Sequence, residues 1–200
     1  MESIFKPGRI TDVALIGDNH YARQGIASFL QVMGSKLRVK ASVRDYQALD
    51  VVLEKTRIDL VFISEPEKCN AGFDTLNFIK KIKINHPYMA ICMYSVHTSP
   101  SLWVRGYVDV FISLKEPMYK WHANIMKLVD SRYRLRCEPA ALPLTSIEWN
   151  VLKRLRNGQD LQRIAAVEKL SYRRVSALKI SATRKLGLRN KTDLLIFLTS

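Results

Sequence analysis

Two hundred residues, 48% of them hydrophobic, suit one or two globular domains with a buried core. No apolar run approaches the roughly 18–20 residues that a membrane-spanning helix needs, and residues 1–9 lack the apolar core of a signal peptide. The sequence therefore predicts a cytoplasmic protein without a membrane anchor. Its formal net charge of +14 favours an acidic partner such as nucleic acid.

The three cysteines are an odd number, and neither they nor the four histidines have the spacing of metal ligands. We expect free thiols in a reducing cytoplasm, no zinc or other metal site, and no cofactor. The residues concerned are Cys69, Cys92, Cys137, His20, His86, His97 and His122.

Short apolar runs alternate with helical patterns through residues 1–130. An unbroken apolar run such as Asp59–Ser64 is typical of a strand in the middle of a parallel sheet. Five strands alternating with helices predict a doubly wound, flavodoxin-like α/β domain with a five-stranded parallel sheet. Its site is expected at the edge where the strands end. The expected strands are Thr11–Ile16, Leu37–Ser42, Asp59–Ser64, Met89–Tyr94 and Val108–Ile112. The expected helices are Tyr21–Met33, Tyr46–Lys55, Phe73–Ile84, a short one near Leu102, and Tyr119–Val129.

Residues 131–143 contain three arginines and Pro139, and they are predicted to be a linker to a second domain, residues 144–200. This second segment carries an ordered series of helix start and stop signals, which predicts four helices. Thr145 and Glu148 form a capping box, Asp160 and Ser171 are N-caps, Gly158 and Gly187 end helices, and Asn190 opens the last helix.

The helix expected from Ser171 to Leu186 has two different faces. Val175, Leu178, Ala182 and Leu186 recur at helical spacing and form an apolar stripe. The opposite face is basic, and a short helix, Leu161–Val167, precedes it through a tight turn. This arrangement predicts a helix-turn-helix. A solvated basic surface helix is the alternative, and the ordered caps around the segment disfavour it.

Positive charge is concentrated in the same segment. Residues 144–200 carry 12 basic and 4 acidic side chains, a net charge of +8, whereas residues 1–143 carry a net charge of +6. A small basic domain is typical of binding to the phosphate backbone of nucleic acid. Membrane association is disfavoured, because the basic residues lie on several short helices rather than on one long amphipathic helix.

These residues carry a resemblance to a known family. In register and without gaps, the segment Leu144–Leu198 resembles the C-terminal DNA-binding domain of the LuxR/NarL family of transcription regulators. It departs from the family at Glu168-Lys169, where Leu-Gly is usual, and at Leu178, where His is usual. The matching positions are Leu144-Thr145, Glu148, Val151-Leu152, Gly158, Ile164-Ala165, Leu170-Ser171, Val175, Arg184-Lys185-Leu186-Gly187 and Arg189–Leu194.

The resemblance implies a role for each part of this segment. The family's base-contacting positions correspond to Ser176, Ala177 and Ile180, and small or apolar side chains there favour A/T-rich DNA. The last helix would contribute Leu194, Leu195 and Leu198 to a dimer; packing of these residues on the first helix of the segment is the alternative. The residues expected to contact phosphates are Arg173, Arg174, Lys179, Arg184, Lys185 and Lys191.

An α/β half followed by this helical half resembles a response regulator, so residues 1–130 are expected to form a receiver-like domain. A working receiver uses two acids after its first strand to hold Mg²⁺ and an Asp phosphoacceptor after its third. It also uses a Ser or Thr after its fourth strand and a Lys after its fifth. Aligned on Gly25, the acidic pair falls on Gly17 and Asp18 and the phosphoacceptor on Ser64. The Ser or Thr position falls on Ser95, and the Lys position falls most plausibly on Ser113. Serine cannot form an acyl phosphate and one carboxylate is a poor Mg²⁺ site, so no phosphorylation switch is expected.

The sequence thus favours a non-enzymatic, sequence-specific DNA-binding transcription regulator. Its degenerate receiver-like domain would serve dimerisation or partner docking, as a homodimer or a heterodimer with a related regulator. The pattern is similar to regulators of enterobacterial capsule and fimbrial genes, of the RcsA and FimW type. One alternative is an adaptor that regulates another transcription factor without stable DNA contact. A phosphate-handling hydrolase is the other, and the chain lacks a phosphate loop, a nucleophile elbow and an HExxH motif.

Overall fold

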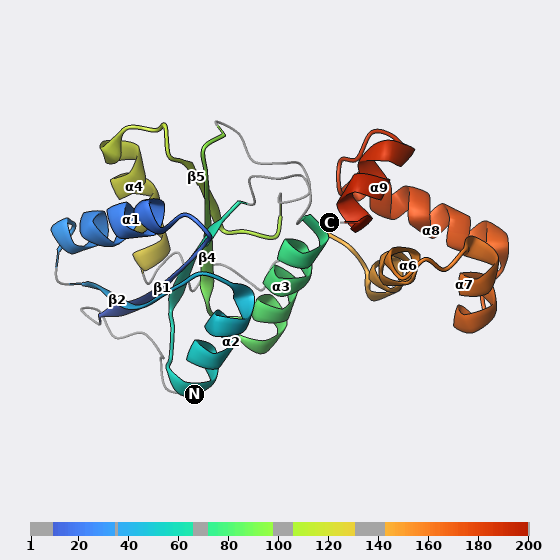
Figure 1. The fold of residues 1–200 in the computed structure, drawn as a ribbon, viewed down its shortest axis with the longest axis horizontal. Coiled ribbons are helices and arrows are strands. Elements are labelled where there is room, and N and C mark those ends of the chain that lie inside the picture. Colours follow the sequence, from blue (N-terminus) through green and yellow to red (C-terminus); the bar gives the residue numbers. More distant parts are fainter. Residues whose placement is uncertain (1–9, 35, 66–71, 98–105, 131–142, 200) are drawn as a thin grey trace. The chain divides into compact units, whose positions relative to one another are not determined.

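The computed structural model of the chain describes residues 10–34, 36–65, 72–97, 106–130 and 143–199 (Figure 1). The chain divides into two compact units. The first contains the five strands with helices α1, α2 and α4, and the second contains α6 to α9. The division falls within α3, whose residues up to Lys80 group with the second unit, as does Tyr107.

The first unit is built on a parallel sheet with the strand order β2-β1-β3-β4-β5. Leu60, Val61 and Phe62 in its central strand are fully buried, as their unbroken apolar run predicts. The strands are β1 (Thr11–Ile16), β2 (Leu37–Val43), β3 (Leu60–Ser64), β4 (Ala90–Ser95) and β5 (Val110–Ser113).

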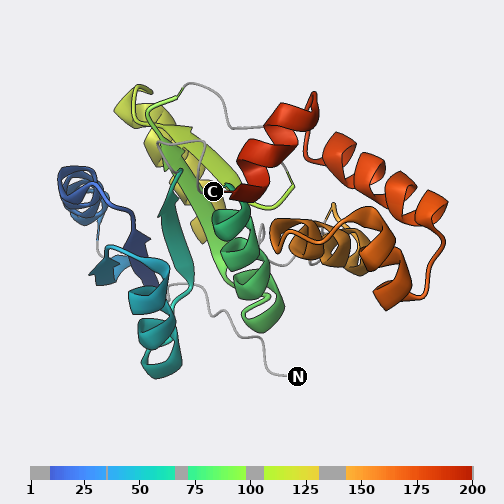
Figure 2. The same cartoon turned by 45° about the vertical axis from the view of Figure 1, so that its right-hand side comes forward.

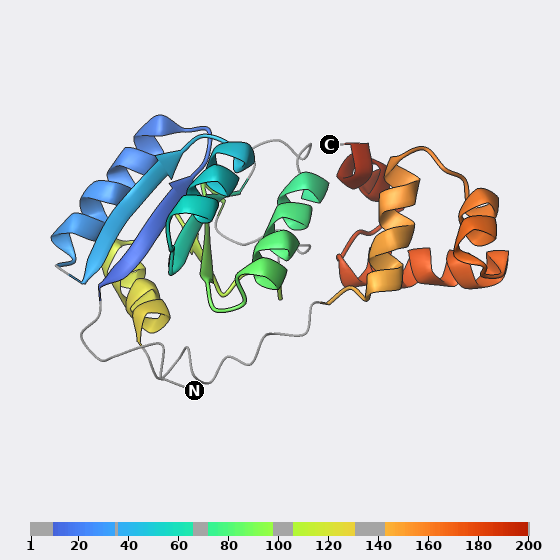
Figure 3. The same ribbon diagram turned by 90° about the horizontal axis from the view of Figure 1, so that it is seen from below.

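Helices cover both faces of this sheet (Figure 3). Helices α1 (His20–Val32) and α4 (Met118–Val129) lie on one face, where Leu30 and Trp121 join the main apolar core. Helices α2 (Tyr46–Lys55) and α3 (Gly72–Asn85) lie on the other face. Side-chain caps begin α1 and α2, where Asn19 and Asp45 accept hydrogen bonds from backbone N–H groups three residues on.

The helices α6 to α9 of the second unit are drawn orange to red in Figure 2. They are α6 (Ser146–Arg156), α7 (Leu161–Glu168), α8 (Tyr172–Lys185) and α9 (Lys191–Thr199). Val151 of α6, Ile164 and Ala165 of α7, and Val175 of α8 form the core that joins the first three helices. Residue 158, a glycine with φ of +75°, ends α6 as expected.

The predicted fold class is confirmed, and the predicted strands and helices of the first unit begin and end within two residues of the observed ones. Three predictions lie outside the described residues: the short helix near Leu102, the linker at 131–142, and the thiols of Cys69 and Cys137. Cys92 is a buried free thiol in β4, and burial raises its pKa well above the ordinary value. Among the described residues, no helix is long and apolar enough to cross a bilayer.

Candidate nucleic-acid interface

A tight turn joins α7 to α8. Lys169 adopts the left-handed conformation, with φ of 54° and ψ of 41°, and the N–H of Leu170 donates to the Ala165 carbonyl at 2.9 Å. Ser171 then begins α8, because its hydroxyl accepts a hydrogen bond from the Arg174 N–H at 3.2 Å. The two helices thus form the helix-turn-helix that the sequence predicts.

The buried face of α8 is the predicted apolar stripe. Val175, Ala182 and Leu186 have no exposed surface, and the half-buried Leu178 packs against the same core. Gly187 has φ of +69° and follows the helix as the expected left-handed residue. This packing determines which side of α8 is exposed to solvent.

The predicted base-reading residues lie on or beside that free side. Ile180 is 62% exposed and Ala177 is also exposed, whereas Ser176 is half-buried. Arg173 and Arg174 are exposed at the start of the helix, and Lys179 is half-buried in its middle. An exposed apolar side chain flanked by cations suits a helix that enters the major groove of DNA.

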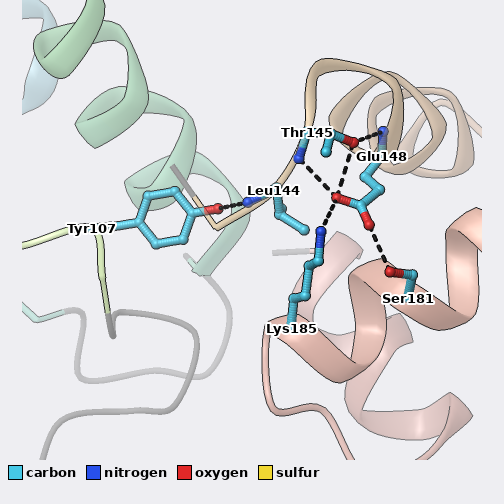
Figure 4. Close-up of polar contacts among 6 residues, drawn as sticks. All are labelled: Tyr107, Leu144, Thr145, Glu148, Ser181 and Lys185. Carbon is cyan, nitrogen blue, oxygen red and sulfur yellow. Dashed lines mark hydrogen bonds and ion pairs between the residues drawn. The ribbon is translucent and has the colours of Figure 1, made fainter. Parts of the chain in front are cut away.

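Glu148 of α6 holds α8 at two places, one turn apart (Figure 4). Its carboxylate accepts hydrogen bonds from the Ser181 hydroxyl at 2.7 Å and from Lys185 Nζ at 2.8 Å. The same carboxylate accepts the Thr145 N–H at 2.8 Å, and the Thr145 hydroxyl accepts the Glu148 N–H at 3.3 Å, which completes the predicted capping box. Sequence reasoning identified the cap but not the link to α8.

The environment of this carboxylate favours its charged form. The Glu148 side chain is only 4% exposed, and burial by itself raises its pKa. The hydrogen bonds from Lys185, Ser181 and Thr145 together outweigh burial and lower the pKa from an ordinary 4.5 to about 2. In the same unit, the Tyr107 hydroxyl accepts a hydrogen bond from the Leu144 N–H at 3.1 Å, next to the cap (Figure 4).

Comparison with known protein families gives a match for the helices α6 to α9. Residues 142–198 match the family model described as bacterial regulatory proteins, luxR family. These residues form a LuxR-family domain. A search of curated proteins found no match.

Solved structures of the response regulator RcsB share the fold. An RcsB–DNA complex matches with 22% identity and a TM-score of 0.56, covering 96% of this chain and 100% of that one. RcsB from Salmonella enterica serovar Typhimurium, bound to promoter rprA with the phosphomimetic BeF₃⁻, matches with 21% identity, the same coverage and a TM-score of 0.54. A structure of two RcsB dimers on two parallel DNAs matches with 21% identity, the same coverage and a TM-score of 0.53. At this identity the likeness establishes a common fold.

A basic hollow lies between the end of α8 and the start of α9 in the LuxR-family domain. Three predicted phosphate contacts, Lys179, Arg184 and Lys191, line it together with Arg189. Asn190 caps α9 by accepting a hydrogen bond from the Asp193 N–H at 2.7 Å. Lys185, the remaining predicted phosphate contact of this region, is held by Glu148 instead and does not line the hollow.

The leucines of α9 divide between core and surface. Leu195 is 52% exposed, as a residue available for a dimer should be. Leu194 and Leu198, by contrast, are only 7% and 8% exposed, so both side chains lie in the core of the single chain. The four-helix unit accommodates both because α9 packs against α6. Ile196, at 40% exposure, lies beside Leu195 in sequence.

The predicted receiver positions all lie at the carboxyl-terminal edge of the sheet, and the structure gives most of them local partners. The Asp18 side chain is 90% exposed and lies 3.6 Å from Arg44 Nε. The Ser95 and Ser113 hydroxyls accept backbone hydrogen bonds from residues two positions on, at 3.0 and 3.2 Å. Gly17 is buried and Ser64 half-buried.

Two further residues at this edge were not predicted, Tyr94 and Arg23. Tyr94 is predicted from the sequence only as the end of a strand, because an aromatic residue in a buried strand is ordinary. Arg23 has the helical spacing of the buried residues Ile26 and Leu30, which places a cation on the inner face of α1.

Proposed function

We propose that this chain is a cytoplasmic, non-enzymatic transcription regulator that binds double-stranded DNA sequence-specifically through α8. The observation that carries the proposal is the free face of α8, on which Ala177 and Ile180 are exposed while Val175 and Ala182 on the opposite face are fully buried. A helix that reads base edges needs both features, an open face and a fixed orientation. Glu148 supplies part of the fixed orientation by bonding Ser181 and Lys185.

Phosphate contacts would position α8 in the groove. Arg173 and Arg174 are exposed at its start. The basic hollow brings together Lys179 from its middle, Arg184 from its last turn and Lys191 from α9. Cations at both ends of a recognition helix can grip the backbone on either side of the major groove. Lys185 is a weaker candidate for a phosphate contact. If its ammonium moved from Glu148 to DNA, the buried Glu148 carboxylate would lose its counter-charge.

Assembly on DNA would use the exposed part of α9. Leu195 is the exposed residue of the three predicted for the dimer, and a homodimer or a heterodimer with a related LuxR-family regulator would cover it. RcsB, which shares the fold, is described as two dimers bound to two DNAs. The receiver-like unit would act in dimerisation or partner docking rather than in phosphorylation, because Ser64 stands at the acceptor position.

Binding selection on random double-stranded DNA with the full-length chain tests the proposal. We expect an enriched motif and retention of that DNA at physiological salt. Arg173→Ala/Arg174→Ala should abolish retention, whereas the matched variant Lys120→Ala/Lys127→Ala, which removes two exposed charges from α4 of the other unit, should not. A chain that enriches no sequence and retains no DNA would instead be an adaptor that acts through another regulator.

A further inference from the structure

Three strand ends meet at the edge of the sheet where a receiver holds its metal and phosphate. Ile16 of β1 pairs with Ile63 of β3, and Ser64 of β3 pairs with Tyr94 of β4. Tyr94 is 1% exposed, and its hydroxyl donates a hydrogen bond across the sheet to the Ile16 carbonyl at 3.2 Å. The ring therefore spans from β4 to β1, and its hydroxyl ends beside Gly17.

The Tyr94 hydroxyl occupies the place that a side chain at position 17 would take. A Cβ atom at Gly17 would lie 2.6 Å from the Tyr94 oxygen and 2.6 Å from the Ser64 Cβ. Carbon cannot approach either atom so closely, and the Ser64 Cβ is attached directly to the backbone of a buried strand. A side chain at position 17 therefore requires the end of β1 to move away from β3 and the Tyr94 ring to shift, and the hydrogen bond from the Tyr94 hydroxyl to the Ile16 carbonyl opposes that movement.

Arg23 reinforces this edge. Its guanidinium, on a residue 8% exposed, donates to the Gly17 carbonyl and, at 3.2 Å, to the Ser42 hydroxyl of β2. A positive charge fixed on the carbonyl of residue 17 disfavours a divalent cation in the same place.

The remaining side chains do not fit the Mg²⁺ that a receiver-like fold implies. Asp18 is the acid left of the expected pair, and its side chain extends into solvent towards Arg44. Mg²⁺ requires a near-octahedral set of oxygen ligands anchored by carboxylates. Nowhere in the described ranges do three Asp, Glu, His or Cys side chains gather as a metal site.

We infer that Tyr94, with Gly17, seals this edge against divalent cations and phosphate and holds the ends of β1, β3 and β4 in one packed arrangement. The loss of receiver chemistry is then steric as well as chemical. This inference deepens the receiver-like half of the proposed function and is independent of DNA binding. If missing carboxylates were the sole obstacle, restoring them would restore metal binding. If Tyr94 seals the edge, the carboxylates will bind metal only once the ring is shortened.

Stability of the sheet tests the size match. Hydrogen exchange of the β1 and β3 amides, followed by mass spectrometry in the full-length chain, reports on this unit alone. We expect Gly17→Ala to speed exchange at least tenfold, and Gly25→Ala, where an added Cβ meets nothing within 4 Å, to leave it unchanged or slower. In a Tyr94→Phe background, Gly17→Ala should cost less than it does alone. An equal cost in both backgrounds would overturn the match.

Magnesium binding tests the seal. Gly17→Asp/Ser64→Asp supplies, with Asp18, the acids that a receiver uses, and a third change, Tyr94→Leu, opens the space. By isothermal titration calorimetry with Mg²⁺, we expect binding by the triple variant and none by the double. Unfolding of the double variant and its rescue by Tyr94→Leu would equally support the seal. Mg²⁺ binding by the double variant, or by neither variant when both are folded, would overturn it. DNA selection by the wild type is unaffected by either outcome, so the two proposals fail separately.

Discussion

Lys185 Nζ in the last turn of α8 lies 2.8 Å from Glu148 Oε2 in the first turn of α6. The Glu148 side chain is 4% exposed and the Lys185 side chain 35% exposed, so the pair is shielded on one side and open on the other. Through it the capping box that begins α6 also fixes the far end of the proposed recognition helix. Removing one partner leaves the other without its counter-charge, which costs more than an exposed ion pair does.

We expect this link to make the stability of the LuxR-family domain dependent on acid pH. The pKa of Glu148 is lowered to about 2 in the folded chain from an ordinary 4.5. Its stabilisation is therefore fully present above pH 4.5 and is lost as the pH falls towards about 2. Glu148→Gln should lower the free energy of unfolding at pH 7 by about 2 to 3 kcal/mol and remove this part of the acid dependence. Denaturant unfolding between pH 7 and pH 3 measures both.

Glu54→Gln is the matched control, because Glu54 is exposed on α2 and carries the same charge. Its effect should stay within about 0.5 kcal/mol at every pH. If Glu148→Gln retains the wild-type loss of stability between pH 4.5 and pH 3, the Lys185–Glu148 pair is not its source.

A second prediction concerns the turn before α8. Lys169 holds φ of 54°, a conformation that costs a residue with a Cβ about 1 kcal/mol relative to glycine. Lys169→Gly should therefore raise the free energy of unfolding by about 0.5 to 1 kcal/mol, as measured by urea unfolding. Lys153→Gly, at an exposed position inside α6, should lower it by about 1 kcal/mol. A loss of stability in both variants would mean that Lys169 is not strained.

The difference between what could and could not be predicted from the sequence lies in the range of the interactions. Caps such as Ser171 and Asp160 bond backbone groups three residues away, so their signal is contained in a few consecutive letters. The glycines at 158 and 187 were predictable for the same reason. The second role of Glu148 depends on partners 33 and 37 positions later, and no local pattern encodes that distance.

Burial was harder to predict in α9, where the spacing of the apolar residues allowed more than one of them to face the core. Five apolar residues in the nine-residue α9 point in nearly all directions, so their spacing did not show which of them face the core. Packing against α6 decided it in favour of Leu194 and Leu198. Tyr94 was missed because an aromatic residue in a buried strand is ordinary. The role of its hydroxyl depends on Gly17, which follows β1, a strand two places away in the sheet.

A third prediction is that small phosphodonors leave the chain unmodified. The acceptor position holds Ser64, whose hydroxyl cannot form an acyl phosphate, and the Asp18 side chain extends into solvent towards Arg44. Intact-mass analysis after treatment with acetyl phosphate and Mg²⁺ should show no added phosphate, and DNA affinity should not change. Stoichiometric phosphate on residues 1–130 would contradict it. Ser64→Asp alone should also remain unlabelled.

A fourth prediction separates the two neighbouring leucines of α9. Leu195→Asp should weaken DNA binding more than it lowers the melting temperature, because the side chain is 52% exposed in the single chain. Leu194→Ala, at 7% exposure, should lower the free energy of unfolding by about 2 to 3 kcal/mol. DNA titrations beside thermal melts of both variants make the comparison. Equal loss of stability in the two would place Leu195 in the core rather than in a dimer.

The last prediction concerns how α8 reads DNA. Ile180 and Ala177 are exposed on its free face, and their apolar side chains can contact thymine methyl groups but cannot make the paired hydrogen bonds that Arg or Lys makes to guanine. We therefore expect the selected motif to have an A/T-rich core, and Ile180→Lys to change which sequences are selected. Lys179→Ala should instead weaken all sequences alike and reduce the slope of log affinity against log salt by about one. Parallel selections on random DNA with wild type and Ile180→Lys, with salt titrations of Lys179→Ala, distinguish the two roles. A wild-type motif centred on G·C pairs, or one unchanged in Ile180→Lys, would show that another surface reads the bases.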